Sequence, residues 1–232
     1  MLADLVRLFD EYGVRATFFC THPGVQVPGH ERALHPNFRR SGDALQLLRT
    51  TLGGSLANLT DVELYRQVVH MTKTFCPEAK GARAHSLHYD TALVALYRSA
   101  GLEYDSSYCM PLVEGIGPFW KEHGILELPI YYMDHLDLME HSTGYEVHRL
   151  GLEGPGLKVF DFHPNMVYTN ALTCEFYEHT KSFYRDPQRL RASRHAGRGV
   201  RSLLVALLEH IAKEGLPTAT LGEVNTLWRQ TL

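Results

Sequence analysis

Residues 5–23 read LVRLFDEYGVRATFFCTHP, and this stretch decides the fold because it places a helix directly before a buried strand. Apolar side chains recur at helical spacing over residues 2–12, and Gly13 ends the predicted helix. Residues 14–20 (VRATFFC) are rich in β-branched and aromatic side chains, which is typical of a buried strand. A helix joined in this way to a strand is the building unit of α/β folds.

The same alternation continues along the chain. We expect helices over residues 60–75, 90–100 and 200–214, with a further helix at the C-terminal end. Thr60 and Glu63 form a predicted capping box at the start of the first of these helices. Strands are expected at residues 31–34, 79–83, 125–132, 157–162 and 218–221. Strands that alternate with helices predict a parallel sheet, open or closed into a barrel, in a single domain spanning residues 1–232.

The composition excludes several classes of protein. A hydrophobic fraction of 44% can fill a core, and a net charge of −3 gives no overall attraction to nucleic acid or anionic membranes. No stretch approaches the roughly 20 apolar residues that cross a bilayer, and the first residues lack the features of a signal peptide. The four cysteines form no Cys-x-x-Cys pair. We therefore expect a cytoplasmic protein that binds no nucleic acid and does not span a membrane, with the oligomeric state left open.

Histidine is the one residue type in excess, with fourteen copies, and two of them stand in the same local pattern. The tripeptide His-Pro-Asn begins at His35 and again at His163, each time after a segment with strand character. Proline after a histidine favours extended geometry at that histidine. A neutral imidazole in such a place can bind a metal or transfer a proton near pH 7. The alternative is that each His-Pro pair belongs to an ordinary loop.

In parallel α/β folds the functional site lies where strands end and loops begin. This rule selects His22, His35, Arg83 with His85, Asp134 with His135, and His163. Arg83 could fix a carboxylate or an oxyanion, or it could form an ion pair at a barrel rim. Asp134 could bind a metal, act as a base or cap the next turn. Asp161 shares a strand face with His163, so it either orients that imidazole or is an ordinary polar residue.

A basic run follows toward the C-terminal end. It could contact a phosphorylated or acidic glycan, but a solvated helix face is the favoured interpretation. Its members are Lys181, Arg185, Arg189, Arg191, Arg194, Arg198 and Arg201. The chain has no Gly-x-Ser-x-Gly elbow, no P-loop and no Gly-x-Gly-x-x-Gly motif, so the corresponding enzyme classes have no support.

The order of these segments resembles the polysaccharide deacetylase (NodB-homology) superfamily of carbohydrate esterases. LVRLFDEYGVRATFFCTHP resembles its first helix and second strand, and GHERALHPNF resembles the segment with the first metal histidine. GARAHSLHYDTALVALYRSAGLEYDSSY resembles the arginine-bearing third motif, LKVFDFHP the last motif, and PTATLGEV the last strand entering the terminal helix. The His-Pro-Asn motifs are most similar to deacetylase-like proteins of bacterial lipopolysaccharide O-antigen clusters.

The resemblance implies a distorted (β/α) barrel, a divalent metal that is typically zinc, and a carbohydrate substrate. The implied reaction removes an N-acetyl group from an amino sugar of a surface polysaccharide or its precursor. His163 would be the general acid, His35 a metal ligand and Arg83 the residue that steadies a catalytic carboxylate. Asp161 completes the expected catalytic set beside His163, and His30 is the candidate second metal ligand. The candidates for substrate binding are His85, Asp134, Asn37 and Asn165.

The chain departs from the family pattern at two places. The family's first strand, which ends in two aspartates, precedes the first helix, whereas this chain begins inside that helix. We therefore expect a barrel that lacks its first strand in this chain. The family's second metal histidine follows the first by four residues, and Arg39 stands there, so His30, His85 or Asp134 would have to replace it.

Two other functions compete with a metal-dependent deacetylase. The first is a catalytically degenerate barrel that binds a glycan without turnover, which the two departures favour. The second is a related cytosolic C–N hydrolase with a small amide substrate that is not a sugar.

Overall fold

The computed structural model describes residues 1–40, 46, 48–50 and 59–231, and the chain forms two compact units assembled from separate segments. The first unit comprises Met1–Arg15, Cys109–Ile116 and Ile130–Ala219. The second unit comprises Ala16–Tyr108, Gly117–Pro129 and Thr220–Leu232. Strands and helices alternate in the chain, so the predicted α/β class is confirmed.

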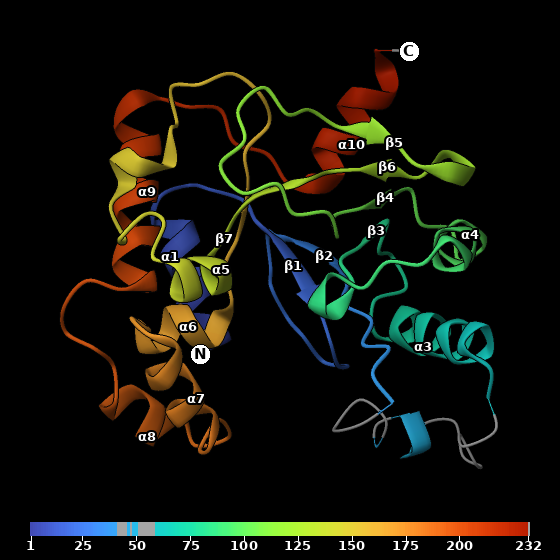
Figure 1. The fold of residues 1–232 in the computed structure, drawn as a ribbon, viewed down its shortest axis with the longest axis horizontal. Coiled ribbons are helices and arrows are strands. Elements are labelled where there is room, and N and C mark those ends of the chain that lie inside the picture. The colour runs from blue at the N-terminus through green and yellow to red at the C-terminus, as the bar shows by residue number, and fades with distance from the viewer. Residues whose placement is uncertain (41–45, 47, 51–58, 232) are drawn as a thin grey trace. The chain divides into compact units, whose positions relative to one another are not determined.

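The second unit is built on a six-stranded sheet whose order is β1-β2-β3-β4-β6-β5 (Figure 1). All neighbouring pairs are parallel except β5 and β6, which are antiparallel. The strands are short: β1 Thr17–Cys20, β2 Glu31–Leu34, β3 Gly81–Ala82, β4 Tyr104–Asp105, β5 Phe119–Trp120 and β6 Leu126–Glu127.

The register of this sheet places the ends of its parallel strands in one row. Leu34 pairs with Ala82, Ala82 with Asp105, and Asp105 with Glu127. The next residue of each strand continues the ladder, since Arg83 N donates to Leu34 O and Ser106 N to Ala82 O. The loops that follow β2, β3, β4 and β6 therefore begin side by side at one edge of the sheet, as the strand-end rule predicted.

Three long helices belong to the second unit: α3 Asp61–Phe75, α4 Thr91–Ser99 and α10 Leu221–Gln230. The predicted capping box at Thr60 and Glu63 is present and begins α3. Helices α3 and α4 pack against each other and bury their apolar faces (Figure 1). Short 3₁₀ turns follow at η1 His85–Leu87 and η2 Glu122–Gly124.

The predicted strand over residues 218–221 is wrong. These residues make no strand, and Thr220 instead caps α10 through a capping box with Glu223. The β-branched threonines suggested a strand, but a threonine three residues before a glutamate is also the signature of a helix start.

The first unit contains a two-stranded parallel sheet of β7 Ile130–Met133 and β8 Val159–Asp161. Tyr131, Tyr132 and Leu150 form its core with Leu203 and Leu207 of α9. The helices of this unit are α1 Leu2–Glu11, α5 Asp134–Glu140, η3 Val147–Leu150, α6 Pro164–Thr169, α7 Cys174–Lys181, α8 Pro187–Ala192 and α9 Val200–Glu214.

The segment 125–132, predicted as one strand, forms two. β6 ends at Glu127 and belongs to the second unit, whereas β7 begins at Ile130 in the first unit. Pro129 lies between them and has no N–H to donate to a ladder, so a single continuous strand is interrupted there. Among the described residues, none of the helices has the length and apolar character that crossing a membrane requires.

Candidate active site

Arg83 lies directly after β3 and is held by Ser106, the residue at the matching position after β4. The guanidinium donates from Nε to the Ser106 carbonyl oxygen and from Nη2 to Ser106 Oγ, both at 2.8 Å. It also lies over the ring of Phe19, 4.4 Å from its centroid, and the residue is only 5% exposed. These contacts fix one orientation of the guanidinium, which an arginine needs in order to hold a carboxylate or an oxyanion.

His35 and His85 meet at the same edge of the second unit. His35 follows β2, His85 lies two residues after Arg83, and His85 N donates to the Pro36 carbonyl oxygen at 2.9 Å. The rings are nearly perpendicular, at 85°, and His85 Nδ1 lies 3.3 Å from His35 Nε2. Two imidazole nitrogens therefore lie side by side, although the two residues are 50 positions apart in the sequence.

The loop that carries His85 has an unusual backbone. Ser86 and Leu87 both have left-handed φ angles, +57° and +53°, which cost an L-amino acid about 1–2 kcal/mol each. Arg39 holds this loop by donating from Nη2 to Ser86 Oγ at 2.7 Å. Arg39 is the residue at the position of the expected second metal histidine, and here it secures the loop that brings His85 to His35.

The described residues supply part of a metal site. Two nitrogen ligands of a tetrahedral zinc ion with ordinary Zn–N bonds lie roughly 3.3 Å apart, the separation seen between His35 and His85. A catalytic zinc site uses three protein ligands, and no group of three histidine, cysteine, aspartate or glutamate residues gathers in the described part of the chain. The pair therefore fits as two ligands and does not form a complete site.

His30, the other predicted ligand, lies at the opposite end of β2 from His35. It precedes the strand, its Nδ1 accepts a hydrogen bond from Ala16 N at 3.1 Å, and its ring packs against Phe18. Four strand residues separate the two histidines, so the five steps from His30 to His35 rise roughly 16 Å and one ion could not bind both.

In the first unit His163 is held by Asp134. His163 Nδ1 lies 2.6 Å from Asp134 Oδ1, and His163 N donates to Oδ2 of the same carboxylate, also at 2.6 Å. Asp134 is fully buried, whereas the His163 side chain is 38% exposed. One carboxylate thus fixes both the backbone and the ring, and it leaves Nε2 on the side of the ring away from Asp134.

The sequence did not pair His163 with Asp134. Asp161 was predicted to orient His163 or to be an ordinary polar residue, and Asp134 was predicted to bind a metal or substrate, act as a base or cap the next turn. Asp134 accepts both hydrogen bonds described above, and it lies near His163 because β7 and β8 are parallel neighbours in which Met133 pairs with Asp161. The residues that follow the two strands, Asp134 and His163, therefore lie together. The sequence signal was present, since both follow strands, but the partners are 29 residues apart.

His135 lies beside this pair. Its ring centroid is 6.1 Å from that of His163. Burial lowers the pKa of His135, and the nearby His163 lowers it further, so His135 is neutral near pH 7.

The two His-Pro-Asn segments differ in structure. After His35 the chain forms a loop, in which Asn37 Oδ1 accepts a hydrogen bond from Arg39 N at 3.1 Å. After His163 the proline begins helix α6, so Asn165 lies in its first turn and is 8% exposed. The identical tripeptides therefore serve different local structures, and substrate binding by the two asparagines stays a prediction.

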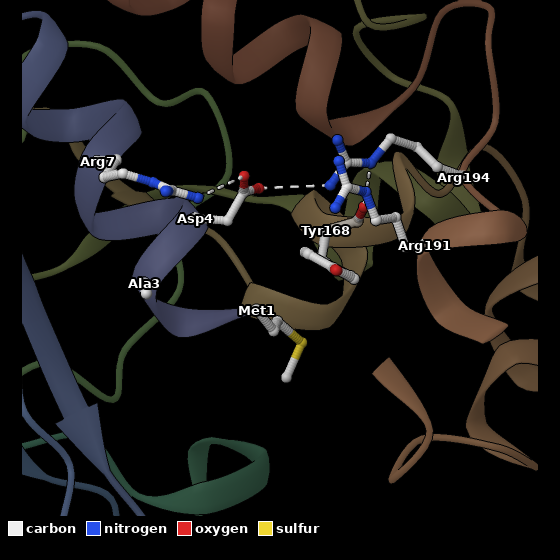
Figure 2. Close-up of a pocket in the computed structure, with 7 residues that line it drawn as sticks. All are labelled: Met1, Ala3, Asp4, Arg7, Tyr168, Arg191 and Arg194. Atoms are coloured by element: carbon white, nitrogen blue, oxygen red, sulfur yellow. Dashed lines mark hydrogen bonds and ion pairs between the residues drawn. The ribbon is translucent and has the colours of Figure 1, made fainter. Parts of the chain in front are cut away.

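A small pocket of about 160 Å³ lies in the first unit beside α1 and α6 (Figure 2). Asp4 is at its centre and forms ion pairs with Arg194 at 3.4 Å and Arg201 at 2.9 Å. Arg194 also donates from Nε to the Tyr168 carbonyl oxygen at 2.7 Å. Much of the basic run is thus paired within this unit, and it spans α7, α8 and α9 rather than one helix face.

Sequence reasoning missed a buried ionic cluster in the second unit. Lys121 contacts Asp105 and Glu127, the last residues of β4 and β6. Strands of two residues are too short to show a periodic pattern, so neither carboxylate could be recognised as a strand end.

Comparisons with known proteins agree on one family. Residues 1–181 match the family model described as WbmS-like, polysaccharide deacetylase. The structure of a proposed polysaccharide deacetylase of Bordetella bronchiseptica, involved in O-antigen biosynthesis, is 25% identical to the chain with a TM-score of 0.74. The alignment covers 90% of this chain and 84% of that one.

A proposed polysaccharide deacetylase of Mycobacterium smegmatis is 16% identical with a TM-score of 0.52, over 99% of this chain and 77% of that one, which is a likeness of fold alone. Among curated proteins, none matches the chain significantly. The structural matches confirm the predicted fold type.

Proposed function

Since the chain belongs to the WbmS-like polysaccharide deacetylases, as its motifs predicted, we propose that it removes an N-acetyl group from an amino sugar. The substrate would be a bacterial surface polysaccharide or its precursor, and the reaction would depend on a divalent metal. The observation that carries this proposal is the pairing of His163 with the buried Asp134 at 2.6 Å.

His163 is the general acid in this proposal. An amine leaves an acetamide readily only after it gains a proton, and a positioned imidazolium can supply that proton. Asp134 holds Nδ1 and its negative charge stabilises the imidazolium, so the proton to be donated sits on Nε2. Because His135 is kept neutral, it does not compete for that proton at neutral pH.

Three residues that follow strands of the second unit have proposed roles in metal binding and charge stabilisation. His35 and His85 would be two ligands of the metal, which when bound activates water and polarises the acetamide carbonyl. Arg83 would hold an anionic group, either a catalytic carboxylate or the oxygen that becomes negative during hydrolysis. We leave His30 out of the ligand set because of its position at the far end of β2.

Acetate release tests the catalytic proposal. Purified protein supplied with zinc, cobalt or nickel is incubated with oligomers of N-acetylglucosamine. We expect His163→Gln to reduce kcat by about two to four orders of magnitude. His179→Gln, at an exposed histidine of α7, is the matched control and should retain wild-type kcat. Glycan binding without acetate release from the wild type would instead favour the non-catalytic barrel.

Metal binding is tested separately by equilibrium dialysis with zinc. We expect His35→Ala and His85→Ala each to weaken zinc affinity by about tenfold or more. His70→Ala, at an exposed histidine on α3, is the control and should bind zinc like the wild type. Equal zinc affinity in all three variants would remove His35 and His85 from the proposed ligand set.

A further inference from the structure

The second unit buries three charged side chains in one cluster. Lys121 Nζ lies 2.7 Å from Asp105 Oδ2 and 2.8 Å from Glu127 Oε2. The exposed fractions of the side chains are 7% for the lysine, 4% for the aspartate and 0% for the glutamate. Removing three charges from water costs several kcal/mol per ion, so a cluster of this kind needs a structural or functional reason.

The register of the sheet explains why the three groups meet. Asp105 pairs with Glu127 across β4 and β6, and Glu127 pairs with Phe119 across β6 and β5. Paired residues share a face, and side chains two positions apart on a strand share it as well. Lys121 follows Phe119 by two residues, so the lysine, the two carboxylates and Phe119 lie on the same side of the sheet.

This cluster contacts two exposed aromatic residues, Tyr89 and Tyr108, and a third, Phe119, packs against Tyr108. Lys121 Nζ lies over the ring of Tyr89, 4.7 Å from its centroid. Glu127 Oε1 accepts a hydrogen bond from Tyr108 N at 2.9 Å. The rings of Tyr108 and Phe119 contact each other edge to face, with centroids 6.2 Å apart and planes at 86°.

All three residues are exposed to solvent. Their exposed fractions are 47% for Tyr89, 54% for Tyr108 and 41% for Phe119. We call these three residues the aromatic platform. The ring of Tyr89 lies against the buried cluster, the backbone of Tyr108 is bonded to it, and the rings of Tyr108 and Phe119 pack on each other. Rings held by such contacts lose less side-chain entropy when a ligand binds.

The platform adjoins the strand ends that carry Arg83 and His85. Ser107 Oγ accepts a hydrogen bond from Ala84 N at 2.9 Å and donates to Asp105 Oδ1 at 2.6 Å. The backbone between Arg83 and His85 is therefore tied to the same cluster that supports the platform.

We propose that the aromatic platform of Tyr89, Tyr108 and Phe119 binds uncharged sugar rings of the glycan chain. The face of a pyranose ring presents C–H groups that pack on the electron-rich face of an aromatic ring. The phenol groups of the two tyrosines add hydrogen-bonding partners for sugar hydroxyls. The choice of a glycan as ligand rests on the proposed function, because a polysaccharide presents further sugar rings beside the one that loses its acetyl group.

Charge favours an uncharged chain over an acidic one. Beneath the platform one ammonium faces two carboxylates, so the cluster contributes no excess positive charge. Burial and the neighbouring Asp105 raise the pKa of Glu127 to about 7, so the cluster lies between neutral and singly negative near that pH. An anionic sugar would be repelled or left unpaired there.

Isothermal titration calorimetry with tetra-N-acetylchitotetraose tests the platform in the full chain. His163→Gln is included in every sample so that turnover does not consume the probe. We expect Tyr108→Ala and Phe119→Ala each to raise Kd by about tenfold, whereas Tyr108→Phe keeps the ring and the affinity. Tyr184→Ala, at a tyrosine of the first unit that is 46% exposed, is the matched control and should not change Kd.

Three outcomes would overturn the proposal: no binding of the tetramer to the protein with an intact platform, an unchanged Kd in both alanine variants, or equal affinity for an anionic hyaluronan tetrasaccharide. Acetate release, measured in protein that retains His163, tests the proposed deacetylase function separately from the platform. Binding through the platform without acetate release would leave the platform standing and overturn the deacetylase. Acetate release that is unchanged by the loss of Tyr108 and Phe119 would support the deacetylase and overturn the platform.

Discussion

At the scale of single residues, the arrangement of His163 resembles that of a histidine built to carry a proton. A fully buried carboxylate binds its Nδ1 and its backbone N–H, so neither the ring nor the loop can turn. Such a contact fixes which nitrogen faces outward and stabilises the charged ring when it forms. The proposed role of the pair depends on the charge of Asp134 as much as on its shape.

Asp134→Asn separates charge from shape. The amide has the size of the carboxylate but cannot stabilise an imidazolium, so we expect kcat for acetate release to fall by about two to four orders of magnitude. KM should change little, because Asp134 is buried and does not face the substrate. Glu140→Gln, at an exposed carboxylate on the same helix as Asp134, is the control and should retain wild-type kcat. An equal loss in both variants would contradict the assignment to Asp134.

At the scale of elements, the pairing of β4, β5 and β6 makes the second unit sensitive to pH. Burial and Asp105 raise the pKa of Glu127 to about 7 from an ordinary value near 4.5. Between these values the folded state binds more protons than the unfolded chain, so stability falls as pH rises through this window. The opposite sign would hold for a carboxyl group whose pKa is lowered by folding.

Glu127→Gln should flatten this dependence. We expect the wild type to lose about 1–3 kcal/mol of unfolding free energy between pH 5 and pH 8 that the variant does not lose. Urea denaturation at a series of pH values measures the difference. A variant whose pH dependence matches the wild type would show that another group titrates in this window.

Strand β3 tolerates only glycine at its first position. A Cβ atom at Gly81 would lie about 2.0 Å from the ring of Tyr104, which crosses this position and donates from its hydroxyl to Glu31 Oε1 at 2.8 Å. We expect Gly81→Ala to lower the unfolding free energy by about 3 kcal/mol or more, because both groups are buried and the ring has no room to move. The double variant Gly81→Ala with Tyr104→Leu should recover part of the lost unfolding free energy. If it recovers none, the steric clash does not involve the Tyr104 ring.

At the scale of the whole molecule, the two units are each assembled from distant segments. The second unit depends on residues near the C-terminal end, since Leu221 N donates to Thr17 Oγ1 and Gly222 N to Glu31 Oε2, both at 2.9 Å. Strands β1 and β2 are therefore tied to the beginning of α10. The family match ends at residue 181, so α10 lies outside the matched part of the chain, whereas Thr17 and Glu31 lie inside it.

Removal of the last helix tests this dependence. A chain ending at residue 219 loses both hydrogen bonds and leaves Thr17 and Glu31 without these two contacts. We expect its midpoint of thermal unfolding to fall by several degrees, about 2–4 °C for each kcal/mol lost. Circular dichroism measures the shift. Leu227→Ala, at a position of α10 that is 61% exposed, serves as the control.

The sequence alone was sufficient for the family, the α/β class and the residues that follow strands, because helical spacing and β-branched runs are local signals. It failed where structure depends on distant partners. The strands of two residues have no periodic pattern, and the pairing of Asp134 with His163 follows from the order of strands. The meeting of His35 and His85 depends on left-handed backbone at Ser86 and Leu87, residues that rarely adopt it.

The left-handed turn after His85 also bears on how the protein could evolve. Glycine at position 86 would relieve backbone strain of about 1–2 kcal/mol, and it would delete the hydroxyl that Arg39 binds. A library selected only for thermal resistance should therefore become enriched in glycine there, while selection for activity should keep serine. The two selections would move this position in opposite directions, so the residue found at 86 among descendants would report which pressure their lineage had faced.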